Sequence, residues 1–253
     1  MSNSNENISN AALVIKTYNR DVVLSFKYPS YGSLKKKYEY CRGNIKDFSL
    51  RSMRRLKLVA RNIAPEMKAT IDLTYPKDFP VDGKTVKKHY SKFRKRLRRL
   101  GINSLWVLEF QKRGAPHFHL MVDGEIDKEL VSKMWFEIVG SGDEKHLKAG
   151  TKVQAIKDEG RVIRYISSYM KKLTQKIVPE EFKNVGRFWG YSFSLLEVTE
   201  KIIQGSYNDL SRGIRILRRW YKSKLRSWGI NWRWKGNGFI VWEGTSPALL
   251  LQL

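Results

Sequence analysis

The 253-residue sequence has few residues for thiol-based sites and few acidic side chains. Cys41 is the only cysteine, so an internal disulfide and a thiolate zinc site are excluded, and a reducing cytoplasm fits. Asp and Glu number 24 against 49 Lys and Arg, which gives a formal net charge of +25. This balance argues against an ordinary metabolic enzyme. It favours a polyanionic partner: nucleic acid first, a membrane surface second.

Long hydrophobic runs are also missing. No apolar run approaches the roughly 18 residues that a membrane-spanning helix needs, and the polar start Met-Ser-Asn-Ser-Asn-Glu-Asn does not look like a signal peptide. We therefore expect no membrane partner and a cytoplasmic location. Hydrophobic residues still make up 42% of the chain, which is enough for a real core.

Periodicity predicts an α+β fold, with an antiparallel sheet and helices packed on one face. In the helices, Leu50, Leu100 and Leu130 each fall on a stripe that we expect to be buried. Strands are predicted over 13–18, 22–28, 69–75, 104–112, 117–122, 151–156 and 193–198, with a final hairpin over 232–242. Helices are predicted over 50–63, 83–100, 127–139, from 158 onward, and over 206–227.

Two of the four histidines stand one residue apart, in the run Pro116-His117-Phe118-His119-Leu120. Because side chains alternate along a strand, His117 and His119 point to one face and Phe118 to the other. Two imidazoles on one face can form half of a divalent-metal site. The alternative is that they are unrelated strand histidines, one of them only hydrogen-bonded.

The preceding strand offers a carboxylate to the same site. A turn over 113–116 folds this strand against the histidine strand, and Glu109 and Gln111 share one of its faces. A Glu at a buried edge carries a desolvation cost that a metal would remove. Two His and one carboxylate suit Mg²⁺ or Mn²⁺ when a phosphate completes the shell. Gln111 is the alternative ligand, and Glu109 can instead be an ordinary solvent-facing residue paired with Lys or Arg.

A second motif lies on the helix predicted after residue 158. Tyr165 and Tyr169 are four residues apart, so both hydroxyls face the same way, with Lys172 on that side. A tyrosine beside a polarised phosphodiester can attack it and form a phosphotyrosine. Lys172 would favour the phenolate or stabilise phosphate charge. Two tyrosines at this spacing are otherwise usual as core or rim aromatics.

The predicted helix 83–100 carries nine Lys and Arg, which are either a solvated face or contacts to DNA phosphates. We expect the phosphate contacts because the whole chain is so basic. The expected DNA-binding residues are Lys84, Lys87, Lys88, Lys92, Arg94, Lys95, Arg113 and Lys171. Aromatic residues near the C-terminus, Trp220 among them, could stack on unpaired bases, but we expect most of them to pack.

Together these motifs resemble the HUH endonucleases, and more narrowly the two-tyrosine rolling-circle replication initiators of phages and plasmids. The resemblance covers about residues 68–200. Besides the Tyr-x-x-x-Tyr-x-x-Lys run, it rests on Thr70–Pro76, Glu109–His119 and Gly186–Gly190. Asp72 interrupts the first of these runs, so its role is open. Ser168 stands where a basic residue often precedes the second tyrosine. No Gly-x-x-x-x-Gly-Lys-[Ser/Thr] run exists, which excludes a fused helicase of that kind.

The resemblance implies a five-stranded antiparallel sheet, a metal held by His117, His119 and Glu109, and nucleophilic roles for Tyr165 and Tyr169. It implies a metal-dependent endonuclease and strand transferase that nicks single-stranded origin DNA, often in a hairpin. Expected partners are a host helicase and polymerase, in a prokaryotic host. The expected segments are a disordered tail (1–11), a hairpin and helix (12–67), the endonuclease core (68–200), and a helix and hairpin packed on it (201–253).

Other interpretations stay open at this point. A single-strand transposase of the same superfamily typically has one tyrosine and a smaller chain. A conjugative relaxase normally has its tyrosine N-terminal to the histidines, whereas His117 here precedes Tyr165. A basic nucleic-acid-binding module without catalysis would use the histidine pair only structurally.

Overall fold

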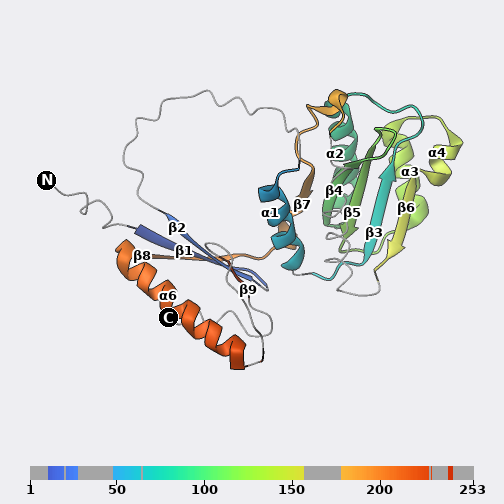
Figure 1. Ribbon diagram of the computed structural model, residues 1–253. Helices are drawn as coiled ribbons and strands as arrows, with labels where there is room; N and C mark the ends of the chain where they lie inside the picture. The colour runs from blue at the N-terminus through green and yellow to red at the C-terminus, as the bar shows by residue number, and fades with distance from the viewer. Residues whose placement is uncertain are drawn as a thin grey trace. The chain divides into compact units, whose positions relative to one another are not determined.

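The computed structural model describes residues 11–19, 21–27, 48–63, 65–156, 178–227, 229 and 239–241. The chain divides into two compact units. Unit 1 consists of Met1–Tyr40 with Val198–Leu253, and unit 2 is Cys41–Glu197. Each unit has its own antiparallel sheet (Figure 1), and the predicted α+β class is confirmed. Within the described ranges, no helix has both the length and the apolar character needed to cross a membrane.

The sheet of unit 2 has five strands in the order β6-β3-β5-β4-β7, and all neighbouring pairs are antiparallel. The strands are β3 (Ala69–Thr74), β4 (Ser104–Phe110), β5 (Pro116–Val122), β6 (Thr151–Ala155) and β7 (Trp189–Tyr191). This is the five-stranded sheet that the family resemblance implies.

The edge strand of this sheet is not where the sequence predicts it. The strand expected over 193–198 is wrong: Phe193–Leu195 is a 3₁₀ turn (η4), and the Phe193 side chain is 89% exposed. The edge strand is the earlier β7. Its Gly190 lies opposite Trp106 of β4, and a Cβ there would stand 2.8 Å from the indole nitrogen. Only glycine lets the β7 backbone come this close to the ring.

The described part of unit 2 contains four helices: α1 (Leu50–Arg61), α2 (Gly83–Arg99), α3 (Lys128–Val139) and α4 (Glu144–Ala149); α4 was not predicted. A short 3₁₀ turn, η3, covers Glu180–Phe182. Helices α2 and α3 cover the sheet face that carries Phe118. Tyr90 of α2 stacks on Phe118 with 4.5 Å between ring centroids, and Trp135 of α3 approaches it edge-on at 6.5 Å.

The buried stripes of these helices are as predicted, except at helix ends. Leu50, Leu100 and Leu130 are 68%, 50% and 41% exposed. Leu50 is the first residue of α1, Leu100 is the C-cap of α2, and Leu130 lies in the first turn of α3. Val131, fully buried, takes the place expected for Leu130.

The sheet of unit 1 has the strand order β8-β1-β2-β9. Its elements are β1 (Ala11–Thr17), β2 (Asp21–Lys27), β8 (Thr199–Gly205), β9 (Phe239–Val241) and the helix α6 (Tyr207–Ser227), which packs against β1. The predicted first hairpin and the last helix are confirmed. The helix expected from 158 onward, most of the hairpin over 232–242 and, apart from Ala11, the tail over 1–11 lie outside the described residues.

Candidate metal centre

Strand pairing gathers polar side chains on the sheet face of unit 2 opposite to Phe118. Thr74 and Asp72 of β3 lie directly across from His117 and His119 of β5, and Glu109 of β4 lies across from His117 on the other side. Directly opposed residues on antiparallel strands point to the same face. The histidine pair therefore stands between a hydroxyl and a carboxylate from β3 and a second carboxylate from β4.

Both imidazole rings are held through their Nδ1 atoms. His119 Nδ1 lies 2.6 Å from Asp72 Oδ1, and His117 Nδ1 lies 2.9 Å from Thr74 Oγ1. When these nitrogens donate, the tautomer places the lone pair on Nε2, where a metal binds. His119 Nε2 is 3.5 Å from Glu109 Oε2, and the two ring centroids are 4.3 Å apart. The arrangement fixes the direction of both imidazoles, so that their Nε2 atoms could bind a metal.

The two histidines differ in their tendency to hold a proton. Burial and the charge of His119 lower the pKa of His117 to about 4, so His117 is neutral at pH 7. Burial also lowers the pKa of His119, but hydrogen bonds and attraction from Asp72 and Glu109 outweigh it, and the pKa ends above its usual value. The two carboxylates therefore favour positive charge beside His119.

Glu109 is buried, with only 6% of its surface exposed. Its Oε1 atom accepts no hydrogen bond from any residue that the structure describes. A buried carboxylate oxygen without a donor is costly, and a cation beside it would remove that cost. This orphaned oxygen, next to two oriented imidazoles, fits a bound metal.

Asp72, His117 and His119 form a group whose potential ligand atoms all lie within 4.8 Å of one another, and these three residues could hold a metal ion. From the sequence we expected Glu109 as the third metal ligand and assigned no role to Asp72. The 2.6 Å contact to Nδ1 matches a carboxylate that orients a histidine ligand. The roles of Glu109 and Gln111 as ligands stay predictions.

The end of β3 is fixed from the helix layer. The Thr74 carbonyl accepts hydrogen bonds from Trp135 Nε1 at 2.8 Å and from His146 Nε2 at 3.0 Å. His146 is in turn held by Ser141 Oγ, 2.8 Å from its Nδ1. These contacts keep the Thr74 hydroxyl beside His117, so α3 and α4 help to position the site. His146 acts structurally here, a role that its isolated place in the sequence does not indicate.

Lys152 is a cation that sequence reasoning missed. It lies on β6 directly across from Asp72, and its side chain is exposed. Opposed residues share a face, so its ammonium group belongs to the face of the histidine pair. Only the strand register reveals this neighbour, because nothing in the local sequence links residue 152 to residue 72.

The predicted DNA contacts on α2 are not gathered around the histidines. Lys84, Lys88 and Lys92 are exposed, as are Arg94 and Lys95, but α2 covers the opposite sheet face. Lys87 Nζ lies 4.2 Å from the centre of the Trp106 ring and donates to the Arg187 carbonyl. Burial lowers the pKa of Lys87 to about 7. Phosphate contacts by these residues stay predictions.

Arg113, also expected to contact DNA, donates hydrogen bonds within the protein. Its guanidinium donates to the carbonyls of Tyr75 at 2.7 Å and Pro76 at 2.8 Å, and to Gln111 Oε1 at 3.0 Å. These bonds tie the β4–β5 turn to the segment that follows β3. They also direct the Gln111 carboxamide oxygen toward Arg113.

The second predicted motif is the pair of tyrosines with the two lysines that follow it. The nucleophile candidates Tyr165 and Tyr169, with Lys171 and Lys172, lie outside the described residues. Their proximity to the histidine pair therefore stays a prediction.

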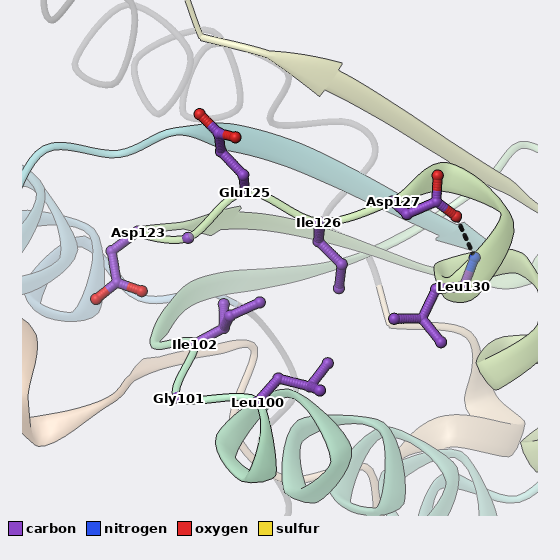
Figure 2. Close-up of a pocket in the computed structure, with 9 residues that line it drawn as sticks. Leu100, Gly101, Ile102, Asp123, Glu125, Ile126, Asp127 and Leu130 are labelled. Atoms are coloured by element: carbon purple, nitrogen blue, oxygen red, sulfur yellow. Dashed lines mark hydrogen bonds between the residues drawn. The ribbon is translucent and has the colours of Figure 1, made fainter.

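A pocket of about 450 Å³ lies elsewhere in unit 2, where α2 leads into β4 and β5 leads into α3 (Figure 2). Ile102, Ile126 and Leu130 line it, together with the acidic Asp123, Glu125 and Asp127. It follows the last residue of β5, at the other end of that strand from His117. Three carboxylates repel a phosphate backbone, so this pocket is a poor place for DNA.

Two comparisons relate this chain to known proteins, and the family model covers the part that carries the site. A family of replication-associated proteins, the ORF2 type, matches residues 68–174, which include the histidine pair and both tyrosines. A replication-associated protein of Pseudomonas phage Pf3 is 26% identical over 153 residues, covering 54% of this chain and 53% of the phage protein. The chain thus spans about half the length of that relative. No solved structure matches. The expected resemblance to phage-type replication initiators is confirmed.

Proposed function

From residues 68–174, which match the family of replication-associated proteins, we propose that this chain initiates replication of a phage-type genome in a bacterial host. In this proposal it is a metal-dependent endonuclease and strand transferase that nicks single-stranded origin DNA. The observation that carries the proposal is the site itself. His117 and His119 are oriented through their Nδ1 atoms, and the unpaired Oε1 of buried Glu109 stands beside them.

His117, His119 and Glu109 would hold a divalent cation, with Asp72 orienting His119. Imidazole and carboxylate ligands with room for a phosphate oxygen suit Mg²⁺ or Mn²⁺. The cation would act as a Lewis acid on the scissile phosphate. The protein's share would be to fix the direction of the two imidazoles, and the Nδ1 contacts with Thr74 and Asp72 are placed to do so.

The strand cleavage would be a transesterification by a tyrosine, Tyr165 or Tyr169. The phenolate oxygen forms a bond to phosphorus, the bond from phosphorus to the 3′ oxygen breaks, and that oxygen leaves and takes up a proton. The 5′ phosphate stays on the protein as a phosphotyrosine, which a later 3′ hydroxyl can attack to rejoin the strand. Lys172 would favour the phenolate. No oxidant or nucleotide is consumed.

The second tyrosine has a specific use in this scheme. Ending a round needs a second attack on the regenerated origin while the first tyrosine still carries DNA. Tyr165 and Tyr169 would lie about 6 Å apart along a helix axis, from four residues at a rise of ~1.5 Å. Two nucleophiles one turn apart could serve one metal in alternation.

The test is covalent attachment of a labelled single-stranded origin oligonucleotide in Mn²⁺, seen as a shifted band on a denaturing gel. We expect an adduct with the wild type, some adduct with Tyr165→Phe and with Tyr169→Phe, and none with the double variant. If one single variant loses all adduct, the alternating scheme is wrong. If the wild type binds DNA and forms no adduct, a non-catalytic binding module is correct.

The related alternatives predict different products. A single-strand transposase would excise and join a DNA segment, and a relaxase would act on a transfer origin. The presence of two tyrosines C-terminal to the histidine pair favours the initiator. Partnership with a host helicase and polymerase is a further part of the proposal, to be tested by replication of an origin plasmid in a host extract.

A further inference from the structure

Helix α6 of unit 1 carries an uninterrupted row of cations on its exposed side. Their spacing of three, four, three and four residues places them on one stripe of the helix. The row consists of Arg212, Arg215, Arg219, Lys222 and Arg226, and all five side chains are exposed. The opposite side of the helix packs inward, with Ile214 only 6% exposed.

The cation row has no acidic counterpart on its helix. Asp209 is the single acidic residue of α6, and it lies in the first turn, where its carboxylate accepts a hydrogen bond from Ser206. Among the described residues, no ion pair or hydrogen bond involves the side chain of any of these five cations. On a helix, a Lys or Arg paired with Glu or Asp at i+4 is stabilising, whereas like charges at that spacing repel one another. A row without such partners needs an external anion to lower that repulsion.

The length of the row fits a nucleic-acid backbone. Fourteen residues separate Arg212 from Arg226, which corresponds to about 21 Å along the helix axis. Phosphates of one strand of B-DNA recur at ~3.4 Å along the duplex axis, so the row covers about six of them. Two apolar side chains border the row, Ile216 and Trp220, which are 57% and 44% exposed.

We propose that this α6 row is a second DNA-binding site, which holds the sugar–phosphate backbone of DNA independently of the metal centre. The site belongs to unit 1, whereas the histidine pair belongs to unit 2. The inference does not rest on the proposed nicking activity, since binding needs neither the metal nor the tyrosines. It assigns unit 1 the task of holding DNA, which the family match over 68–174 does not cover.

The test is the salt dependence of DNA binding by the full chain, measured by fluorescence anisotropy in EDTA so that no cleavage occurs. One variant changes Arg212, Arg215, Arg219, Lys222 and Arg226 to Gln. A matched control changes five exposed lysines of unit 2 to Gln: Lys57, Lys128, Lys133, Lys145 and Lys148. Both variants lose the same charge. Each phosphate contact contributes roughly 0.9 to the slope of log K against log salt for a duplex and roughly 0.7 for a single strand.

We expect the α6 variant to lose about 4.5 units of slope on the duplex or about 3.5 on the single strand, and the control to lose less than about 1. The DNA form on which the slope falls, duplex or single strand, is the form that the row holds. Equal losses in both variants would mean that binding follows net charge alone and would overturn the proposal, as would no loss in the α6 variant. If that variant fails to fold, Arg215→Gln and Arg219→Gln are tested singly. Each should lower the slope by about 1, and no change in either also overturns the proposal.

Discussion

Asp72 is the residue whose change tests the metal centre most directly. In the structure its carboxylate lies 2.6 Å from His119 Nδ1. Removing a carboxylate that orients a histidine ligand typically weakens metal binding by roughly 10- to 100-fold, which is about 1.4 to 2.8 kcal/mol. Asp72→Asn keeps an acceptor oxygen but loses the charge, so we expect a loss near the lower end. Asp72→Ala removes the acceptor as well and should fall near the upper end.

The measurement is calorimetric titration of the full chain with Mn²⁺. ¹⁵N chemical shifts of the His119 ring in the metal-free protein report whether its Nδ1 hydrogen bond is lost. Thr70→Val is the matched control, because Thr70 lies on the same face of β3 but opposite Met121. The control should bind Mn²⁺ as the wild type does. Unchanged affinity in Asp72→Ala would refute the reasoning, and a loss well beyond 100-fold in both variants would make Asp72 a ligand itself.

Three further outcomes are expected. His117→Ala or His119→Ala should abolish nicking and leave most single-strand affinity intact, because affinity comes mainly from phosphate contacts; equal losses of binding and nicking in a gel assay would contradict this. Glu109→Ala should raise the Mn²⁺ concentration needed for cleavage more than Gln111→Ala does, because Gln111 already binds Arg113; the reverse ranking would exchange their roles. Burial lowers the pKa of Lys87 from 10.5 to about 7, so between these pH values the folded chain binds fewer protons than the unfolded chain. The free energy of unfolding should therefore rise from pH 7 toward 10.5, by at most ~1.4 kcal/mol per pH unit. Lys87→Met should flatten that rise in urea unfolding, and an unchanged slope would mean that Lys87 stays protonated.

Much of the fold of unit 2 could be predicted because its elements follow local rules. Period-two and period-3.6 patterns locate most strands and helices, and Ser49, Asp82 and Asp127 cap α1, α2 and α3 through side-chain bonds to backbone N–H groups. The edge strand could not be placed, since Trp189–Tyr191 is short and its pairing depends on Gly190 meeting Trp106.

The candidate site could be predicted only in part, for a related reason. Alternation along one strand places His117 and His119 together, and a hairpin brings Glu109 to them. The partners from β3 and β6 depend on strand order and register, which no local pattern encodes. Thr74 and Asp72 become neighbours of the histidines, and Lys152 a neighbour of Asp72, only in the folded chain.

The pairing of β1 with β8 has a consequence for how the chain folds as it is made. Leu13 lies opposite Ile203, and Lys16 forms an ion pair with Glu200 at 2.9 Å, so β1 receives this partner about 190 residues after its own synthesis. At ~5–20 residues per second, the ribosome takes roughly 10 to 40 s to deliver it. During that time all of unit 2 emerges, and β1 presents one unpaired backbone edge. Such an edge is a template for pairing with another nascent chain. Faster translation shortens this exposure, and a lower expression level makes an encounter with another chain rarer. Both should therefore favour the monomeric product over aggregates.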